Sequence, residues 1–232
     1  MAEKRIVVVI PAFNEEDSIA QVIGDIPSGL VEEIVVVNNR STDNTAERAA
    51  HAGATVLQEN RRGYGSACLK GLEYVMPKGY DIVVFLDADY SDHPEEMPSL
   101  LQPIIEEGYD LVIGSRAAGE REEGAMPPQA RFGNWLATRL IQLLWNYRFT
   151  DLGPFRAITT DALRKIGMED TNYGWTVEMQ IKAARLGMKT TEVPVRYRKR
   201  IGASKISGTL SGTIKAGWKI LYTIARYSTK SS

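Results

Sequence analysis

Residues 82–89 read Ile82-Val83-Val84-Phe85-Leu86-Asp87-Ala88-Asp89. The run of five apolar residues predicts a buried β-strand, and two carboxylates follow it directly. In an open α/β sheet, ligands bind beyond the carboxyl ends of the parallel strands. Mg²⁺ and Mn²⁺ prefer oxygen ligands, with water and substrate phosphates completing the coordination. The stretch therefore predicts a strand that ends at a site for Mg²⁺ or Mn²⁺.

Similar apolar segments alternate with helical segments on both sides of this strand. Alternation of this kind is typical of βαβ units. The expected fold class is therefore α/β, a Rossmann-like and mainly parallel sheet with helices on both faces. The predicted strands are residues 5–10 (stopped by Pro11), 33–37, 54–57, 82–86 and 111–113, and the predicted helices between them are residues 17–26, 46–50 and 63–77.

The pattern changes after Gly119. Residues 120–129 combine charges with Gly124 and a Pro127-Pro128 pair, which predicts a mobile loop. Beyond the loop, the periodicity predicts further helices and one more strand. The helices are expected at residues 135–145, 173–186 and 206–227, and the strand at residues 190–195.

The composition is that of a globular protein. The chain has 232 residues, of which 44% are hydrophobic and 25% charged, so wholesale disorder is excluded. No uninterrupted apolar run reaches the roughly 18 residues of a transmembrane helix, and the run before Pro11 is too short for a signal peptide. The single cysteine, Cys68, excludes an intrachain disulfide and fits a reducing compartment.

The charges are distributed unevenly along the chain. The net charge is −1, yet residues 182–232 carry 12 lysines and arginines and a single acid, Glu192. This asymmetry predicts a polyanionic partner at the basic end, such as phosphates, nucleic acid or an anionic membrane. The basic segment has no recognised nucleic-acid motif and the remainder is acidic, so nucleic acid is the least favoured of these partners.

Two more polar clusters follow predicted strands. Residues 11–15 come after the first strand and residues 38–41 after the second. Turn and cap chemistry would explain either cluster alone. Together with Asp87-Ala88-Asp89, they indicate one site, because parallel strands end at the same edge of a sheet.

An ordered set of motifs resembles the family-2 inverting glycosyltransferases with the GT-A fold. The later motifs resemble the dolichyl-phosphate or polyprenyl-phosphate mannose and glucose synthases within that family. The resemblance extends over about residues 5–225. The motifs are Pro11-Ala12-Phe13-Asn14-Glu15, Ser41-Thr42-Asp43-Asn44-Thr45, Arg62-Gly63-Tyr64-Gly65-Ser66-Ala67, Asp87-Ala88-Asp89, Gly114-Ser115-Arg116, Thr150-Asp151, Pro154-Phe155-Arg156-Ala157, Glu178-Met179, Val193-Pro194-Val195 and Ser204-Lys205.

The resemblance implies metal-dependent transfer of a hexose, with inversion, from a nucleotide-diphosphate sugar (GDP-mannose or UDP-glucose type) to a polyprenyl or dolichyl phosphate. A phosphate acceptor is already ionised, so the need for a general base is relaxed. Asp87 and Asp89 would carry Mg²⁺ or Mn²⁺, with Ser91 where relatives often have a metal-contacting Gln and Asp92 as its substitute. The implied nucleotide-sugar contacts are Pro11, Phe13, Glu15, Val37, Asn39, Asp87, Ala88, Asp89, Arg116, Arg200 and Lys205.

Three residues are implied at the reacting centre. Arg116 and Arg131 match arginines that act on the acceptor phosphate or the sugar diphosphate, because guanidinium groups suit bidentate phosphate contacts. Asp151 matches the family's acid near the reacting centre, with Glu178 as the second candidate; capping and a helix-surface position are their structural alternatives.

The chain departs from the family at the second strand. Asn38-Asn39 stands where paired aspartates are common, and Arg40 where a small residue is common. An Asn carbonyl still accepts a hydrogen bond but carries no charge. The base, uridine or guanosine, therefore stays open. A non-catalytic nucleotide-sugar-binding protein is one alternative function.

The last predicted helix carries an apolar stripe and several cations. Ile206, Leu210, Ile214, Gly217, Leu221 and Ile224 fall on one stripe, and Lys215, Lys219 and Arg226 lie off it. Such a helix can lie in a membrane interface, or it can pack on the domain with its lysines in water. We expect a catalytic domain at residues 1–205, an interfacial helix at residues 206–232 and a peripheral location at the cytoplasmic membrane face. Transfer to a soluble acceptor is the alternative.

Overall fold

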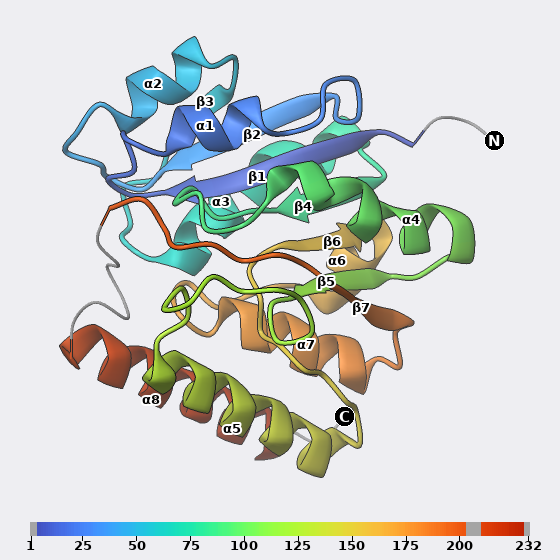
Figure 1. The fold of residues 1–232 in the computed structure, drawn as a ribbon. Coiled ribbons are helices and arrows are strands. Elements are labelled where there is room, and N and C mark those ends of the chain that lie inside the picture. Colours follow the sequence, from blue (N-terminus) through green and yellow to red (C-terminus); the bar gives the residue numbers. More distant parts are fainter. Residues whose placement is uncertain (1–3, 203–209, 230–232) are drawn as a thin grey trace.

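Seven strands form one mixed sheet in the computed structural model, which describes residues 4–202 and 210–229 (Figure 1). The sheet order is β3-β2-β1-β4-β6-β5-β7, and every pairing is parallel except those of β6. The predicted α/β class with a mainly parallel sheet is confirmed. The strands are β1 (Ile6–Ala12), β2 (Glu33–Asn38), β3 (Thr55–Gln58), β4 (Ile82–Phe85), β5 (Leu111–Ser115), β6 (Arg156–Thr159) and β7 (Thr190–Pro194).

Helices cover both faces of this sheet. The face with α1, α2 and α4 holds one apolar core, and the face with α3, α5, α6, α7 and α8 holds the other. Successive residues of a strand point to opposite faces. Val7 and Val9 accordingly join one core, and Val8 the other. The helices are α1 (Ile19–Gly24), α2 (Thr45–His51), α3 (Tyr64–Val75), α4 (Met97–Glu107), α5 (Pro128–Trp145), α6 (Thr160–Ile166), α7 (Trp175–Arg185) and α8 (Leu210–Thr229), with 3₁₀ turns η1 (Met76–Lys78) and η2 (Pro94–Glu96).

The strand directions bring five segments to one edge of the sheet. Because β1, β2, β4, β5 and β7 all run the same way, their carboxyl ends meet there. The antiparallel β6 begins at this edge, since Arg156 pairs with Phe85 of β4 and Ile113 of β5. The segment before β6 therefore reaches the same edge as the segments after β4, β5 and β7.

Several elements differ from the sequence-based expectations. Pro11 does not end β1, which continues to Ala12. Helix α5 begins at Pro128, inside the predicted loop. The short strand β6 (Arg156–Thr159) was not predicted, because only its two central residues are apolar. Helices α4 and α6 were likewise not predicted.

Helix α8 packs on the domain through a face that shares Ile224 with the predicted stripe. Ile224 and Tyr227 are buried in the core shared with α5 and α7. Ile214 and Leu221, by contrast, are exposed, together with Trp218. Most of the described part of the stripe therefore faces away from the domain, as a helix in a membrane interface would require. Of that stripe, Ile206 lies outside the described residues and the side chain of Leu210 is not described. Among the described helices, none is long and apolar enough to cross a bilayer.

Candidate functional site

The predicted metal ligands lie immediately after β4. Asp89 is 8% exposed, and its Oδ1 accepts hydrogen bonds from the backbone N and the Oγ of Ser91, at 2.9 and 2.5 Å. Ser91 is itself 1% exposed, and its hydroxyl donates a hydrogen bond to Asp89. Ala88, between the two aspartates, is buried. The turn thus presents the carboxylates of Asp87 and Asp89, with Ser91 as a support of Asp89.

Three acidic side chains gather here without enough hydrogen-bond donors. Oδ1 of Asp87 and both carboxylate oxygens of Asp92 are buried and have no hydrogen-bond partner. Burial, and then the charge of Asp89, raises the pKa of Asp87 to about 7. Burial, and then the charge of Asp87, raises the pKa of Asp92 well above its ordinary value.

This donor set fits a divalent cation. Buried carboxylate oxygens without partners are costly, and a hard cation satisfies such oxygens. In the described parts of the chain, no group of three or more His, Cys, Asp or Glu side chains is already arranged around one metal position. The two carboxylates of Asp87 and Asp89 therefore offer a partial site, which further ligands such as water or phosphate must complete.

Replacing Asp87 by asparagine should stabilise the ligand-free protein at alkaline pH. The folded-state pKa lies above the unfolded value, so the wild type loses stability as pH rises from about 4 to about 7. Asp87→Asn removes that penalty, and its advantage should be on the order of a few kcal/mol above pH 7 and should vanish below about pH 4. Urea unfolding at several pH values measures it. A variant less stable than wild type at pH 8 would contradict the assignment.

The predicted nucleoside contacts meet where β1 and β2 end. Pro11 pairs with Val37 in the sheet register, and the Arg62 guanidinium lies 4.4 Å from the ring centroid of Phe13. The side chain of Val37 packs in the core beside α3, so only its backbone is placed to meet a nucleoside. Glu15 is 9% exposed.

Asn39 is occupied in holding the next loop. Its Nδ2 donates to the carbonyls of Glu59 and Arg61, at 3.2 and 2.7 Å, and its Oδ1 accepts from the backbone N of Gly63 at 2.8 Å. An aspartate could not donate to those two carbonyls. The presence of Asn in place of Asp at position 39 therefore has a structural reason. The Oδ1 of Asn39 keeps one lone pair that can accept a further hydrogen bond.

The Gly63-Tyr64-Gly65 motif lets the start of α3 approach a distant turn. A Cβ on Gly65 would lie 2.1 Å from the carbonyl oxygen of Asp170, and Gly63 adopts a φ of 145°. Ser66 donates its backbone N to the carbonyl of Thr171 at 2.9 Å. The motif thus fixes the loop that Asn39 holds.

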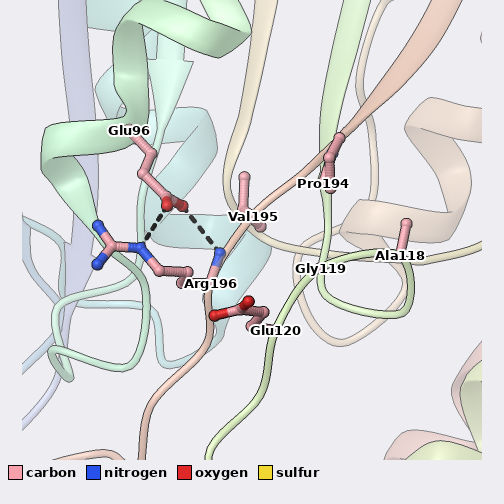
Figure 2. Close-up of a pocket in the computed structure, with 7 residues that line it drawn as sticks. All are labelled: Glu96, Ala118, Gly119, Glu120, Pro194, Val195 and Arg196. Carbon is pink, nitrogen blue, oxygen red and sulfur yellow. Dashed lines mark hydrogen bonds and ion pairs between the residues drawn. The ribbon is translucent and has the colours of Figure 1, made fainter.

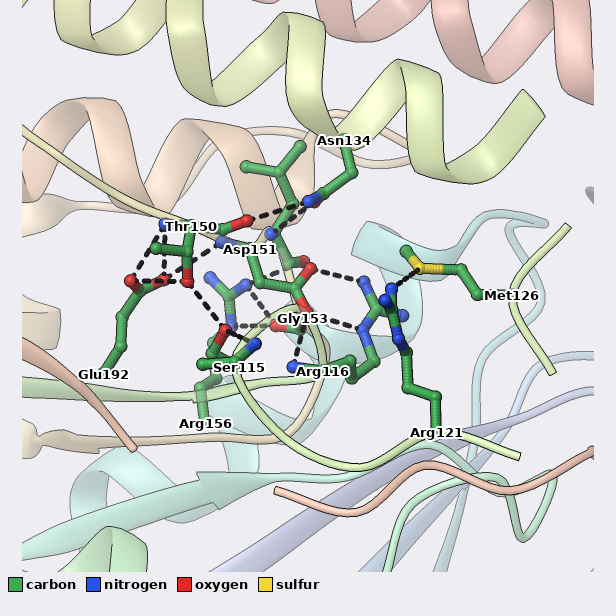
Figure 3. Close-up of polar contacts among 12 residues, drawn as sticks. Ser115, Arg116, Arg121, Met126, Asn134, Thr150, Asp151, Gly153, Arg156 and Glu192 are labelled. Carbon is green, nitrogen blue, oxygen red and sulfur yellow. Dashed lines mark hydrogen bonds and ion pairs between the residues drawn. The ribbon is translucent and has the colours of Figure 1, made fainter. Parts of the chain in front are cut away.

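Arg116 and Asp151 form a buried bidentate ion pair (Figure 3). Nη2 of Arg116 lies 2.7 Å from Oδ1 of Asp151, and its Nε and backbone N donate to Oδ2 at 2.9 and 2.7 Å. Asp151 is fully buried. Burial opposes the charge of Arg116, but Asp151 outweighs it, and the pKa of Arg116 is raised well above its usual value.

These contacts favour a positioning role for Asp151. A carboxylate saturated by a guanidinium has little capacity to accept a proton from substrate. The Nη1 of Arg116, by contrast, makes no hydrogen bond with the described residues, and the side chain is 13% exposed. Arg116 is therefore the member of the pair that can reach an anionic ligand.

The loop that carries Asp151 is held from several directions (Figure 3). Glu192 of β7 accepts from the backbone N atoms of Thr150 and Asp151, and Asn134 of α5 bonds Thr150 and Leu152. Arg156 is fully buried and donates to the carbonyls of Leu152, Gly153 and Thr176. Glu192 and Asn134 were not predicted, since nothing local in the sequence shows that they meet this loop.

Glu178 and Arg131 have other surroundings. Glu178 is 1% exposed and accepts from the backbone N of Asp170 and the hydroxyl of Tyr227, so it anchors α8. Arg131 is exposed in the first turn of α5, and its side chain has no hydrogen bond or ion pair with the described residues. Its role on substrate stays a prediction.

The segment after β7 runs across this edge of the sheet. The backbone N atoms of Arg198 and Ile201 donate to the carbonyls of Ser91 and Asp89, at 2.9 and 3.0 Å. The Arg116 guanidinium lies 5.0 Å from the ring centroid of Tyr197. Arg200 contacts Glu15 and Asp89. The predicted contact Lys205 lies outside the described residues.

A shallow pocket lies at the start of this segment (Figure 2). Arg196 binds Glu96 there through its backbone N and its Nε, at 2.9 and 2.6 Å. A Cβ on Gly119 would lie 2.0 Å from the carbonyl oxygen of Val195, so the two chain segments pack backbone to backbone. The lining contains none of the predicted site residues, and the pocket is a packing feature beside the site.

The charge asymmetry has an internal explanation. At least six cations of residues 182–232 pair with carboxylates of the first 181 residues, and they do so at 2.6–3.5 Å. The prediction of a polyanionic partner from net charge alone was therefore too simple. These cations are Lys182, Arg196, Arg198, Arg200, Lys219 and Arg226.

Residues 7–167 match the model of glycosyl transferase family 2. The chain belongs to this family. An uncharacterized glycosyltransferase of Mycobacterium tuberculosis is 36% identical over 227 residues, which cover 95% of this chain and all of that protein. An undecaprenyl-phosphate mannosyltransferase of Micrococcus luteus is 31% identical, with 90% of each chain covered. The predicted family and enzyme class are confirmed.

Solved structures agree on the GT-A fold. Glucosyl-3-phosphoglycerate synthase of Mycobacterium tuberculosis, in complex with Mn²⁺, UDP and phosphoglyceric acid, has a TM-score of 0.80 and 26% identity. The match covers all of this chain and 81% of the synthase chain. A glycosyltransferase with a similar fold thus binds Mn²⁺ and a nucleoside diphosphate, in agreement with the predicted cofactor.

Proposed function

We propose that this glycosyltransferase moves a hexose from a nucleoside-diphosphate sugar to a polyprenyl phosphate at a membrane surface, with inversion and with Mg²⁺ or Mn²⁺. The mannosyltransferase of Micrococcus luteus supports a lipid-phosphate acceptor, and the synthase complexes support a metal and a nucleotide donor. The feature of this chain that carries the proposal is the outer surface of α5 and α8.

Eight large apolar side chains are exposed on these two helices, which pack side by side (Figure 1). Trp218 is 72% exposed and Leu143 is 80% exposed. Large apolar side chains exposed together on neighbouring helices often mark an interaction or membrane surface, and Trp, Tyr and Phe favour the interface of a bilayer. We name the set the α5–α8 apolar surface: Phe132, Trp135, Leu143, Leu144, Ile214, Trp218, Leu221 and Tyr222.

The charges of the two helices suit an anionic surface. Neither α5 nor α8 contains an acidic residue. Arg131 and Lys215 are exposed on the same two helices. Neither side chain forms an ion pair with the described residues. Basic residues near an anionic bilayer add to the attraction of apolar and aromatic groups.

Helix α5 connects this surface to the site. Asn134 binds Thr150 and Leu152, on either side of Asp151, at 2.9 and 2.8 Å. Phe132 and Trp135 flank Asn134 in the sequence, with ring centroids 5.8 Å apart. A lipid held at these rings would bring its phosphate toward the loop that carries the Arg116–Asp151 pair.

The chemistry follows from the residues at the edge. Asp87 and Asp89 would hold the metal ion, which when bound stabilises negative charge on the departing diphosphate. Arg116, oriented by Asp151, would bind the acceptor phosphate or the donor diphosphate through its free Nη1. The acceptor phosphate is already an anion, so no side chain needs to remove a proton from it.

A soluble acceptor is the second candidate. It is favoured by the similarity over the whole chain to glucosyl-3-phosphoglycerate synthase, whose complexes contain phosphoglyceric acid. Arg116 could bind a small phosphorylated acceptor as well as a lipid phosphate. The exposed surface of α5 and α8 would then have no role in turnover.

Flotation and turnover in the same vesicles test the proposal. With vesicles of phosphatidylcholine, phosphatidylglycerol and undecaprenyl phosphate, the wild type should float and should convert UDP-glucose or GDP-mannose to an organic-extractable product with Mn²⁺. The double variant Trp135→Ser/Trp218→Ser should float at least tenfold less, because it removes two exposed interfacial anchors.

The matched control is Ile105→Ser, which removes an exposed apolar side chain from α4 on the opposite face of the sheet. It should float like the wild type. Nucleotide binding should be equal in all three proteins. The soluble-acceptor alternative would replace the proposal if the enzyme did not float, formed no product from the lipid phosphate and formed product from 3-phosphoglycerate.

A further inference from the structure

Arg200 forms ion pairs with two carboxylates at once. Its Nη1 lies 2.9 Å from Oδ2 of Asp89, and its Nη2 lies 2.7 Å from Oε1 of Glu15. Asp89 follows β4 and Glu15 follows β1, so the guanidinium bridges the predicted metal-binding turn and the predicted nucleoside end of the site. The side chain of Arg200 is 24% exposed, and its Nε is buried without a hydrogen-bond partner.

The backbone around Arg200 is tied to the same turn. The side chain of Arg198 donates hydrogen bonds to the carbonyls of Tyr90 and Asp92. Its guanidinium also lies 3.3 Å from the ring centroid of Tyr90. The backbone N of Ile201 donates to the carbonyl of Asp89 at 3.0 Å. The attachment of the segment thus holds Arg200 beside Asp89 while leaving its long side chain able to change partner.

The surroundings explain why a cation must stand at this place. Asp87, Asp89 and Asp92 repel one another in a buried setting, and the Arg200 guanidinium contacts Asp89 directly. Oδ1 of Asp89 is occupied by Ser91, so Oδ2, which Arg200 holds, is the oxygen left for a metal ion. A guanidinium and a divalent cation cannot both occupy that oxygen at short range, because they repel.

We propose that Arg200 is the counter-ion of Asp89 in the ligand-free enzyme and moves from Asp89 to the donor diphosphate when a divalent cation binds. Without nucleotide, the cation must displace Arg200 and leave it with a single partner. With nucleotide, the diphosphate offers Arg200 a new bidentate partner. Arg200 therefore couples metal binding to nucleotide binding, and this coupling is reciprocal.

Mn²⁺ titration followed by electron paramagnetic resonance of the free ion tests this exchange without any acceptor. Arg200→Met should bind Mn²⁺ alone about tenfold more tightly than the wild type. UDP or GDP should strengthen Mn²⁺ binding in the wild type. The ratio of the Mn²⁺ affinities with and without nucleotide should be about tenfold smaller in Arg200→Met. The affinity of the variant for the nucleotide should also fall, because it loses a phosphate contact.

Lys199→Met is the matched control, since it removes one positive charge from the neighbouring residue, which is exposed and has no ion pair with the described residues. If the loss of long-range repulsion alone were responsible, both variants would bind Mn²⁺ equally tightly, and that result would overturn the proposal. Arg200→Gln has the same expected outcome and carries the test if the methionine variant does not fold. The Mn²⁺ titration alone is decisive if neither nucleotide binds, and the result is independent of the lipid acceptor.

Discussion

Replacing Arg116 by methionine is expected to lower the free energy of unfolding by about 3–5 kcal/mol. The substitution leaves the carboxylate of Asp151, which is 0% exposed, without its bidentate partner. Breaking a buried ion pair from one side is among the most destabilising changes, because a charge remains buried and unpaired. Urea unfolding monitored by circular dichroism measures the loss.

The double variant Arg116→Met/Asp151→Leu separates stability from activity. Replacing both partners by apolar side chains should recover most of the lost stability. Turnover should stay at least 100-fold below wild type, since the guanidinium that would bind phosphate is gone. If the free energy of unfolding of the single variant Arg116→Met lay within about 1 kcal/mol of the wild-type value, the pair would not support the loop.

Replacing Asp89 by alanine should reduce kcat/KM by about 10³-fold or more, at a cost of several kcal/mol in transition-state stabilisation. The change removes a carboxylate that pairs with Arg200 and that would hold the metal ion. It should not unfold the protein, because it also relieves repulsion with Asp87 and Asp92. Initial rates at saturating Mn²⁺ and a thermal melt measure the two effects.

The control for this variant is Asp161→Ala, which removes an exposed carboxylate that pairs, among the described residues, with Arg164 alone on α6. Its turnover should equal that of the wild type. Asp89→Ala turnover within tenfold of the wild type would place the metal elsewhere and would remove the basis for the Arg200 exchange.

Much of the fold was readable along the chain. The β-branched runs predicted β1, β2, β4 and β5, because strands buried on both faces need apolar side chains at successive positions. The carboxylates after β4 predicted the turn that carries Asp87 and Asp89. Such patterns are local, so a single segment contains all the information needed to recognise them.

Other features depend on residues far apart in sequence. Strand β6 has four residues and takes its place by pairing with β4 and β5, not through its own propensity. The face through which α8 packs on the domain could not be predicted, because it depends on the shape of α5 and α7. The internal matching of charges was equally hidden, since Lys219 and Asp170 meet only after folding.

The family motifs, the α/β architecture and the position of the acidic turn after β4 could be predicted along the chain, since apolar periodicity and strand-end chemistry are encoded within short segments. Three features instead depend on contacts formed in the fold: Arg116 saturates Asp151, Arg200 pairs with Asp89, and α8 exposes one of its apolar faces. Each of these features depends on distances between side chains that are far apart in the sequence and meet only in the folded protein. A guanidinium becomes a counter-ion, a phosphate ligand or a surface charge according to what lies a few ångströms away.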